Sequence, residues 1–162
     1  MKIEEATLAD LDALVAAWVT LAQEQRDHGS HVRADPNREA MRESLSQSIV
    51  VDDLLVARAD GEIVGFVTLE IERGRLEQDV TRGIVPYLFV APDRRGEGIG
   101  AELLEGAESR LEDQGADVVS LAVMADNEAA QRFYRRHGYD RHRVTMEKPT
   151  SNESDTHSKD DR

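Results

Sequence analysis

The stretch Arg94-Arg95-Gly96-Glu97-Gly98-Ile99-Gly100 places two cations and three glycines directly before a run of helix-forming residues. Glycine tolerates positive φ angles and lets a backbone approach a ligand closely. The N–H groups at a helix start are unpaired and lie at the positive end of the helix dipole, so they attract anions. These residues indicate a phosphate-binding turn. A plain connection between a strand and a helix is the alternative interpretation.

The same turn also fits a dinucleotide-binding pattern, because Gly96, Gly98 and Ala101 match Gly-x-Gly-x-x-Ala. In that pattern the glycines follow the strand directly, whereas residues 91–95 intervene here. Only about 35 ordered residues follow the helix, too few for further βαβ units. The Gly-Lys-Ser/Thr of a P-loop does not occur. A dinucleotide-binding protein therefore stays a weaker alternative.

A second group of residues with chemical potential runs from Asn127 to Tyr139 and contains Phe133, Tyr134 and Gly138. Phe133 is most simply a core residue. Tyr134 points about 100° further around the predicted helix and could carry its hydroxyl into a cleft. A tyrosine on a helix more often packs than reacts, so this group alone is a weak signal.

The elements that must position these residues follow from the spacing of apolar side chains and from turn residues. Strands are predicted over residues 2–6, 54–59, 62–71, 84–90, 117–125 and 139–148, and helices over about 10–26, 36–49, 99–114 and 127–137. Asp60-Gly61 is a hairpin signal, and Pro86 predicts a bulge or a sheet edge. This order gives a mixed α/β sheet with helices on both faces.

Together, LFVAPDRRGEGIGAELL and DNEAAQRFYRRHGY resemble the GCN5-related N-acetyltransferase (GNAT) superfamily. Arg95, Gly98 and Gly100 match its Arg/Gln-x-x-Gly-x-Gly/Ala pattern, and residues 127–139 match its later Asn-x-x-Ala-x-x-Phe-Tyr-x-x-x-Gly-Phe/Tyr pattern. The resemblance covers roughly residues 2–148. It implies an acyl-CoA fold, α/β with a mixed, mostly antiparallel sheet of about six to seven strands. We assign residues 1–149 to this domain and residues 150–162 to a disordered acidic tail.

The resemblance also implies acetyl transfer from acetyl-CoA to a primary amine by direct attack. The cofactor's arm would lie where two central strands splay near Pro86, with Val123 beside it, a backbone N–H near Val90 would bind the oxyanion, and Tyr134 would be the general acid. The implied cofactor-binding residues are Leu88, Phe89, Val90, Arg94, Arg95, Gly96, Glu97, Gly98, Ile99, Gly100, Ala101 and Asn127. No metal is implied. A non-catalytic acyl-CoA-binding module remains an alternative.

The composition of this 162-residue chain, whose formal net charge is −13, limits the kinds of partner that it can bind. A surface of this charge repels nucleic acids. The absence of Cys excludes disulfides, thiolate metal sites and a cysteine nucleophile. With no apolar run near the roughly 18 residues of a membrane span and no signal-peptide core, we expect no membrane contact and a cytoplasmic location. A homodimer is an open option.

The acidity itself has two interpretations. Only three residues are lysines, namely Lys2, Lys148 and Lys159. An acidic, lysine-poor composition resembles proteins of halophilic archaea, where high salt screens self-repulsion. An ordinary acidic protein from a GC-rich genome is the alternative.

The acceptor amine, small molecule or protein, would be selected by residues 22–50 and the loop 73–83. His28 and His31 are candidate contacts there. The acidic surface could favour cationic acceptors such as polyamines, aminoglycosides or lysine side chains, although adaptation to salt explains the same acidity. The general base is open: Glu70 and Glu72 lie at strand ends, and Tyr87 stands where family members often carry an acidic residue.

Overall fold

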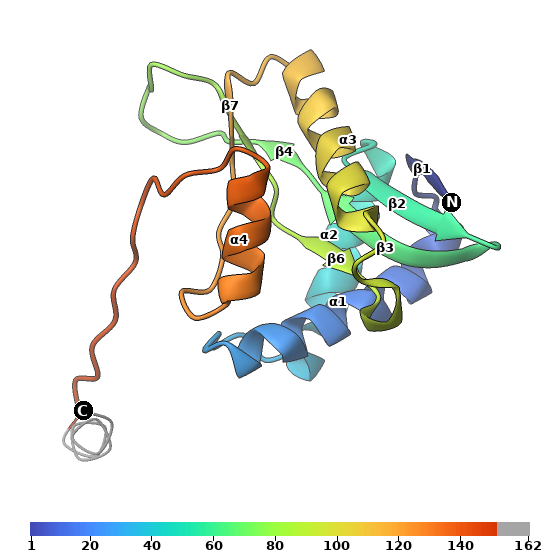
Figure 1. The fold of residues 1–162 in the computed structure, drawn as a ribbon, viewed down its shortest axis with the longest axis horizontal. Helices are drawn as coiled ribbons and strands as arrows, with labels where there is room; N and C mark the ends of the chain where they lie inside the picture. The colour runs from blue at the N-terminus through green and yellow to red at the C-terminus, as the bar shows by residue number, and fades with distance from the viewer. Residues whose placement is uncertain (152–162) are drawn as a thin grey trace. The chain divides into compact units, whose positions relative to one another are not determined.

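The protein is described by a computed structural model of residues 1–151. Residues Met1–Gln131 form one compact unit, and the described residues from Arg132 onward belong to a second (Figure 1). Most of the predicted tail, residues 152–162, lies outside the described part of the chain. Each unit is described by itself.

The first unit opens with strand β1 (Lys2–Glu5), a 3₁₀ turn (Leu8–Asp10) and helix α1 (Leu11–Asp27). The α1 side chains Leu14, Val15, Trp18, Val19 and Ala22 are buried along one helical stripe. A second 3₁₀ turn (Asp35–Asn37) leads into α2 (Arg38–Val50), which buries Leu45 and Ile49. The two helices begin within a residue or two of their predicted positions, because the apolar spacing and Pro36 mark them.

The two helices pack against an antiparallel sheet. Its strands are β1, β2 (Leu54–Ala59), β3 (Glu62–Thr68) and β6 (Leu88–Val90), in the order β1-β2-β3-β6. Strands β2 and β3 form the predicted hairpin at Asp60-Gly61. Side chains of β2, β3 and β6 join those of α1 and α2 in one apolar core that contains Trp18, Leu54, Val56, Phe66 and Phe89.

A smaller sheet contains β4 (Glu70–Ile71), β5 (Arg82–Ile84) and β7 (Val118–Ser120), in the order β4-β5-β7 with β5 and β7 parallel. The predicted strands 62–71 and 84–90 are therefore each divided between the two sheets. The second division lies at Pro86, which has no N–H for a ladder bond. Beside it, the Tyr87 N–H donates to Thr68 Oγ1 at 3.1 Å, so the predicted irregularity at Pro86 is confirmed.

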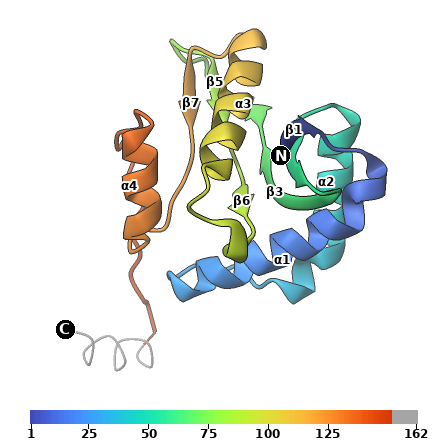
Figure 2. The ribbon, with the colours of Figure 1, turned by 45° about the vertical axis from the view of Figure 1, so that its right-hand side comes forward.

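Helix α3 (Ile99–Asp113) covers the other face of the sheets (Figure 2). It buries Ile99, Leu103, Leu104, Ala107 and Leu111. The helix lies so close that a Cβ on Gly65 of β3 would stand 3.0 Å from Leu103 and 2.7 Å from the Phe89 carbonyl oxygen. Helices thus cover both faces, as predicted, and the described residues form seven strands in two sheets.

Helix α4 (Glu128–Arg136) begins in the first unit and ends in the second. Two strand predictions near it need correction. The strand expected over 117–125 is only the three residues of β7, and no strand forms over 139–148. In the latter segment the side chains of Val144 and Met146 are 68% and 88% exposed. They are therefore not buried against an apolar surface, and the segment pairs with no strand among the described residues.

Candidate active site

The glycine turn connects β6 to α3 through a 3₁₀ turn (Pro92–Arg94). Gly96 and Gly98 have φ angles of +84° and +86°, and a Cβ on either would meet nothing within 4 Å. Gly98 is the N-cap of α3, and the first helical bond runs from the Glu102 N–H to the Gly98 carbonyl at 3.2 Å. The N–H groups of the first helical turn, from Ile99 to Ala101, are therefore left without helical acceptors beside open space, which suits an anion.

The arginines of this turn are engaged with neighbouring side chains. Arg94 Nε lies 3.2 Å from Glu97 Oε1. Arg95 Nε donates to the Val90 carbonyl at 3.0 Å, and its terminal nitrogen donates to Glu24 Oε1 of α1 at 2.8 Å. The Arg95 guanidinium also lies 5.8 Å from the centroid of the Phe89 ring. Arg95 thus ties the turn to β6 and α1, and backbone N–H groups remain as the uncommitted anion donors.

Glu24 was not predicted as a functional residue. Glu24 lies in the last third of α1 and is not one of the buried core residues of that helix. No sequence pattern around it indicates a partner 71 residues away. Only the three-dimensional fold brings it to Arg95.

Strand β6 has a free edge beside this turn. The Thr68 N–H donates to the Tyr87 carbonyl, and the Ala91 N–H donates to the Val64 carbonyl, at 2.9 and 2.8 Å. Because backbone groups of an antiparallel strand face its partner at every second residue, Tyr87, Phe89 and Ala91 face β3. Leu88 and Val90 therefore point their N–H groups away from β3. Strand β6 is the last in its sheet, so these two donors are open to a ligand.

The chain also diverges on this side. Strands β5 and β7 pair in parallel as far as Ile84 and Ser120, and the Val85 N–H donates to the Ser120 carbonyl at 3.0 Å. Beyond this point β6 pairs with β3, whereas residues 121–125 form no strand. Val123, on that segment, is 38% exposed. The two segments thus separate at the predicted splay near Pro86.

Asn127 stands at the start of α4. Its Oδ1 accepts the Ala130 N–H at 3.1 Å, which makes it a helix cap. The preceding residue, Asp126, has its Oδ1 2.8 Å from Nδ1 of His28 at the end of α1. Gln131 Nε2 donates to the Ala125 carbonyl at 2.7 Å. These contacts fix the turn that presents Asn127, and they assign His28 to this turn.

Tyr134 belongs to the second unit. Its ring centroid lies 5.2 Å from that of Phe133 and 5.9 Å from that of Tyr139, both edge to face. Burial raises the pKa of Tyr134 to about 12. The hydroxyl therefore keeps its proton at neutral and moderately alkaline pH.

An open pocket of about 460 Å³ lies between α1, the following loop, α2 and Tyr87, the residue before β6. The rings of Trp18 and Tyr87 meet edge to face at 6.3 Å, and the Tyr87 hydroxyl lies 3.9 Å from Met41 Sδ. His31 lines this pocket, and His28 does not. Residues of the predicted 22–50 region thus form most of its wall, whereas the loop 73–83 contributes none of it.

The two glutamates considered as bases lie on the smaller sheet and its continuation. Glu70 is exposed. Glu72 lies 3.5 Å from Arg82 Nε and accepts a hydrogen bond from Gln78 at 2.9 Å. Neither lines the pocket.

Most of the sequence matches a known family. Residues 15–139 match the model of the acetyltransferase (GNAT) family. The chain is also 34% identical over 134 residues to a protein of Archaeoglobus fulgidus named an uncharacterized N-acetyltransferase, over 83% of this chain and 89% of that protein. This chain belongs to the GNAT family. It is an acetyl-CoA-dependent acyltransferase, and acetyl-CoA is its acyl donor.

Two further comparisons place this GNAT acetyltransferase among enzymes with different acceptors. It is 27% identical to the aminoalkylphosphonate N-acetyltransferase of Salmonella typhimurium, over 85% of this chain and 84% of that protein. The structure of AAC(6′)-Iy with the bisubstrate analogue CoA-S-monomethyl-acetylneamine shares its fold, with a TM-score of 0.69, 19% identity, and coverage of 93% of this chain and 98% of that one. No helix in the described part of the acetyltransferase is long and apolar enough to cross a membrane.

Proposed function

We propose that this GNAT enzyme transfers the acetyl group of acetyl-CoA directly to a primary amine, with Tyr134 as the general acid. The observation that carries this proposal is the free β6 edge directly before the glycine turn. Its two outward N–H groups, on Leu88 and Val90, precede a helix start whose own N–H groups are unpaired. One continuous segment of chain thus offers donors for an acyl carbonyl and for a pyrophosphate.

We place the cofactor along this segment. Its pyrophosphate would accept hydrogen bonds from backbone N–H groups between Arg95 and Gly100, and its arm would run along Leu88–Val90. Asn127 supports this placement, because its Oδ1 is used as a helix cap while its amide nitrogen can still donate. Arg94 and Glu97 pair with each other, so in this arrangement they add little net charge beside the phosphates.

The proposed reaction needs no covalent enzyme intermediate. The lone pair of the neutral amine attacks the acetyl carbonyl carbon, and the Val90 N–H stabilises the oxyanion that develops. The C–S bond then breaks, Tyr134 protonates the departing sulfur, and the proton lost by the acylated nitrogen returns to the Tyr134 oxygen. A phenol with a pKa of about 12 is a weaker acid than an ordinary thiol, whose pKa is about 8.5 for the Cys side chain. Complete proton transfer from Tyr134 to the sulfur therefore depends on the proton that the acylated nitrogen returns to the Tyr134 oxygen.

Turnover by Tyr134→Phe tests this role. Loss of the hydroxyl should lower kcat about 100-fold, the size expected for loss of a general acid, with acetyl-CoA affinity unchanged. Tyr139→Phe removes a hydroxyl from the neighbouring ring and should retain activity. CoA release from acetyl-CoA and mixed amines measures both variants, with amine-free reactions as blanks. An unchanged rate in Tyr134→Phe would assign the proton to water or another group.

The raised pKa of Tyr134 adds a pH dependence to the same test. Because burial raises this pKa to about 12, Tyr134 should cause no loss of activity up to about pH 10. A wild-type rate that falls with a midpoint below pH 10, and does not fall in Tyr134→Phe, would contradict the raised pKa of Tyr134 and leave its role as proton donor standing.

The match to the GNAT family favours the acetyltransferase over the two alternatives from the sequence, the non-catalytic acyl-CoA-binding module and the dinucleotide-binding protein. The halophilic origin and the cytoplasmic location stay predictions from composition.

A further inference from the structure

The residues that line the pocket beside β6 indicate which chemical class of acceptor amine the proposed reaction uses. From its lining we infer that the acceptor is an amine that also carries an acidic group, a carboxylate or a phosphonate, on a short apolar body, with the acidic group bound by Arg33. This inference rests on the proposed N-acetyltransferase function. It also reverses the expectation, drawn from the acidic surface, of a cationic acceptor.

The first argument is the charge of the pocket lining. Acidic residues number 33 of the chain's 162, so a random set of nine residues would include about two of them. None of the nine lining residues is acidic, and one, Arg33, is a cation. In a protein with a net charge of −13, a wall without carboxylates and with an arginine disfavours a cationic ligand and attracts an anionic one.

The second argument is that Arg33 is uncommitted, in contrast to its neighbours. Arg26 donates to the His31 and Val32 carbonyls, Arg38 pairs with Asp35 at 2.7 Å, and Arg42 pairs with Asp12 at 2.8 Å. The Arg33 guanidinium forms no ion pair or side-chain hydrogen bond within residues 1–151. A planar guanidinium with its donors unused is suited to bidentate binding of a carboxylate or phosphonate.

The third argument is that the segment carrying Arg33 is fixed in place. Asn37 Nδ2 donates to the Arg33 carbonyl at 2.7 Å, and Arg26 holds the two carbonyls before it, at 3.2 and 3.4 Å. The backbone of Arg33 is therefore held at both the α1 and the α2 side, and only its side chain has to be ordered when a ligand binds.

The rest of the wall defines the body of the acceptor. The other lining side chains are mostly apolar, and they include Trp18, Val32, Pro36, Met41 and Tyr87. Methylene groups or a ring would pack on these surfaces. Tyr87 borders the pocket, and the next residue, Leu88, begins β6 and directs its N–H to the free edge of the sheet. The amine end of a ligand held by Arg33 would thus be directed towards the proposed acetyl site.

The test compares acceptors of similar length and opposite charge. The probes are 2-aminoethylphosphonate, 3-aminopropanoate, n-propylamine and 1,3-diaminopropane, assayed by CoA release at one fixed ionic strength. We expect kcat/KM to be highest for one of the two acidic amines and lowest for the diamine. The two acidic probes also distinguish a phosphonate-binding from a carboxylate-binding site.

The variant that tests the pocket is Arg33→Gln, at an exposed residue. Loss of a charged hydrogen-bonding partner should raise KM for the acidic amine about tenfold or more, with kcat and the KM for acetyl-CoA unchanged. Arg33→Glu should move the preference towards the diamine, and Arg33→Lys should keep part of the original one. Arg38→Gln removes the same charge from a residue outside the pocket lining and should behave as wild type.

The outcomes separate this inference from the function on which it rests. Acetylation of the diamine in preference to both acidic amines, or an Arg33→Gln enzyme within twofold of wild type on the acidic amine, would overturn the inference and leave the N-acetyltransferase function standing. CoA binding without acetylation of any probe or of the mixed amines would overturn the proposed transfer to a primary amine. In that case calorimetric binding of the same amines to the CoA-loaded protein, with and without Arg33→Gln, still decides whether the pocket selects acidic amines.

Discussion

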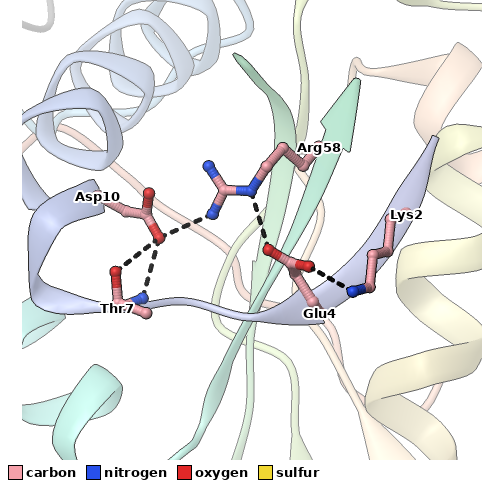
Figure 3. Close-up of polar contacts among 5 residues, drawn as sticks. All are labelled: Lys2, Glu4, Thr7, Asp10 and Arg58. Atoms are coloured by element: carbon pink, nitrogen blue, oxygen red, sulfur yellow. Dashed lines mark hydrogen bonds and ion pairs between the residues drawn. The ribbon is translucent and has the colours of Figure 1, made fainter. Parts of the chain in front are cut away.

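Two regions of the molecule differ in whether their polar groups are paired. One is a clamp of five residues, Lys2, Glu4, Thr7, Asp10 and Arg58, and the other is the turn at Gly96–Gly98. In the clamp, Arg58 Nε donates to Glu4 Oε2 at 2.9 Å and a terminal nitrogen donates to Asp10 Oδ2 at 3.0 Å (Figure 3). Asp10 also accepts the Thr7 N–H at 2.9 Å, and Lys2 pairs with Glu4 at 3.2 Å. In the turn, the backbone N–H groups from Ile99 to Ala101 have no helical acceptor.

This difference separates residues that stabilise the fold from residues that we propose to bind a ligand. The clamp joins β1, the first 3₁₀ turn and β2, and its charges satisfy one another. Burial opposes ionisation of Asp10, but the hydrogen bonds from Arg58 and Thr7 outweigh it, so the pKa of Asp10 lies below its ordinary value. Hydrogen bonds from Arg58 and Lys2 likewise lower the pKa of Glu4. Substitutions in the clamp should affect stability, and substitutions in the turn should affect binding.

The largest effect should come from the turn. Gly98→Glu puts a side chain at a φ of +86° and a negative charge where the pyrophosphate is proposed to bind. Acetyl-CoA should raise the melting temperature of the wild type, because it binds the folded state, and this rise should vanish in the variant. Gly74→Glu adds the same charge in a loop where a Cβ meets nothing within 4 Å and φ is not positive. It should keep the full acetyl-CoA shift, and a normal shift in Gly98→Glu would remove the turn from the site.

Salt should act on the whole surface more than on either region. At about 0.01 M salt the Debye length is roughly 30 Å, and it falls to about 3 Å at 1 M. Repulsion among the excess carboxylates of a chain with a net charge of −13 should then be screened. If the halophilic interpretation holds, stability should rise by several kcal/mol (an order-of-magnitude estimate) between about 0.1 and 2 M KCl, with acetyl-CoA affinity changing less. Thermal melts in KCl measure this, and a flat or falling melting temperature would contradict the interpretation.

A smaller effect on stability should come from the clamp. Asp10→Asn removes the charge from a carboxyl that is 9% exposed, and should cost about 2 kcal/mol at pH 7, which lowers the melting temperature by about 4–8 °C. Because folding lowers the pKa of Asp10, its stabilisation is present above the unfolded value of about 3.9 and disappears as pH falls through the folded value. The difference between variant and wild type should therefore shrink in acid.

The matched control for the clamp is Asp60→Asn. Asp60 is exposed in the hairpin turn at a φ of +53°, a conformation that Asn also tolerates, and its substitution removes the same charge. Denaturation of both variants from pH 3 to 7 makes the comparison. Equal losses in the two variants would mean that the Asp10–Arg58 pair contributes nothing beyond net charge.

The smallest effect should come from the Glu24–Arg95 pair, which joins α1 to the turn. Both side chains are substantially exposed, so the pair should contribute less than about 1 kcal/mol. Glu24→Gln should weaken acetyl-CoA binding about two- to threefold and leave the melting temperature nearly unchanged, because Arg95 positions the turn through the Val90 carbonyl. Glu112→Gln, at an exposed residue of α3, is the control. If the two variants bind acetyl-CoA equally well, Glu24 has no part in positioning the turn.

The sequence predicted what depends on local spacing. The buried α1 positions Leu14, Val15 and Trp18, the Asp60-Gly61 hairpin and the break at Pro86 each follow from residues close together in the chain. The contacts of Arg95 with Glu24 and Val90, and of His28 with Asp126, join distant segments and left no local pattern. The strand expected over 139–148 was wrong because alternation alone does not supply a surface on which Val144 and Met146 could be buried. The sequence could not show that the charge of the pocket differs from that of the rest of the surface, because the net charge of the chain is a sum over both.

The free edge of β6 has a further consequence for how the protein survives in a crowded solution. An unpaired strand edge is a template on which another chain can add a strand, the first step of aggregation. Here the exposed stretch is only three residues long, Pro86 precedes it without an N–H, and Arg95 occupies the Val90 carbonyl at its far end. Another polypeptide would find too few consecutive partners to dock. A slender molecule with one or two amide groups of its own would need no more than these. In the proposed binding mode, the edge would therefore accept a cofactor and not an aggregating neighbour.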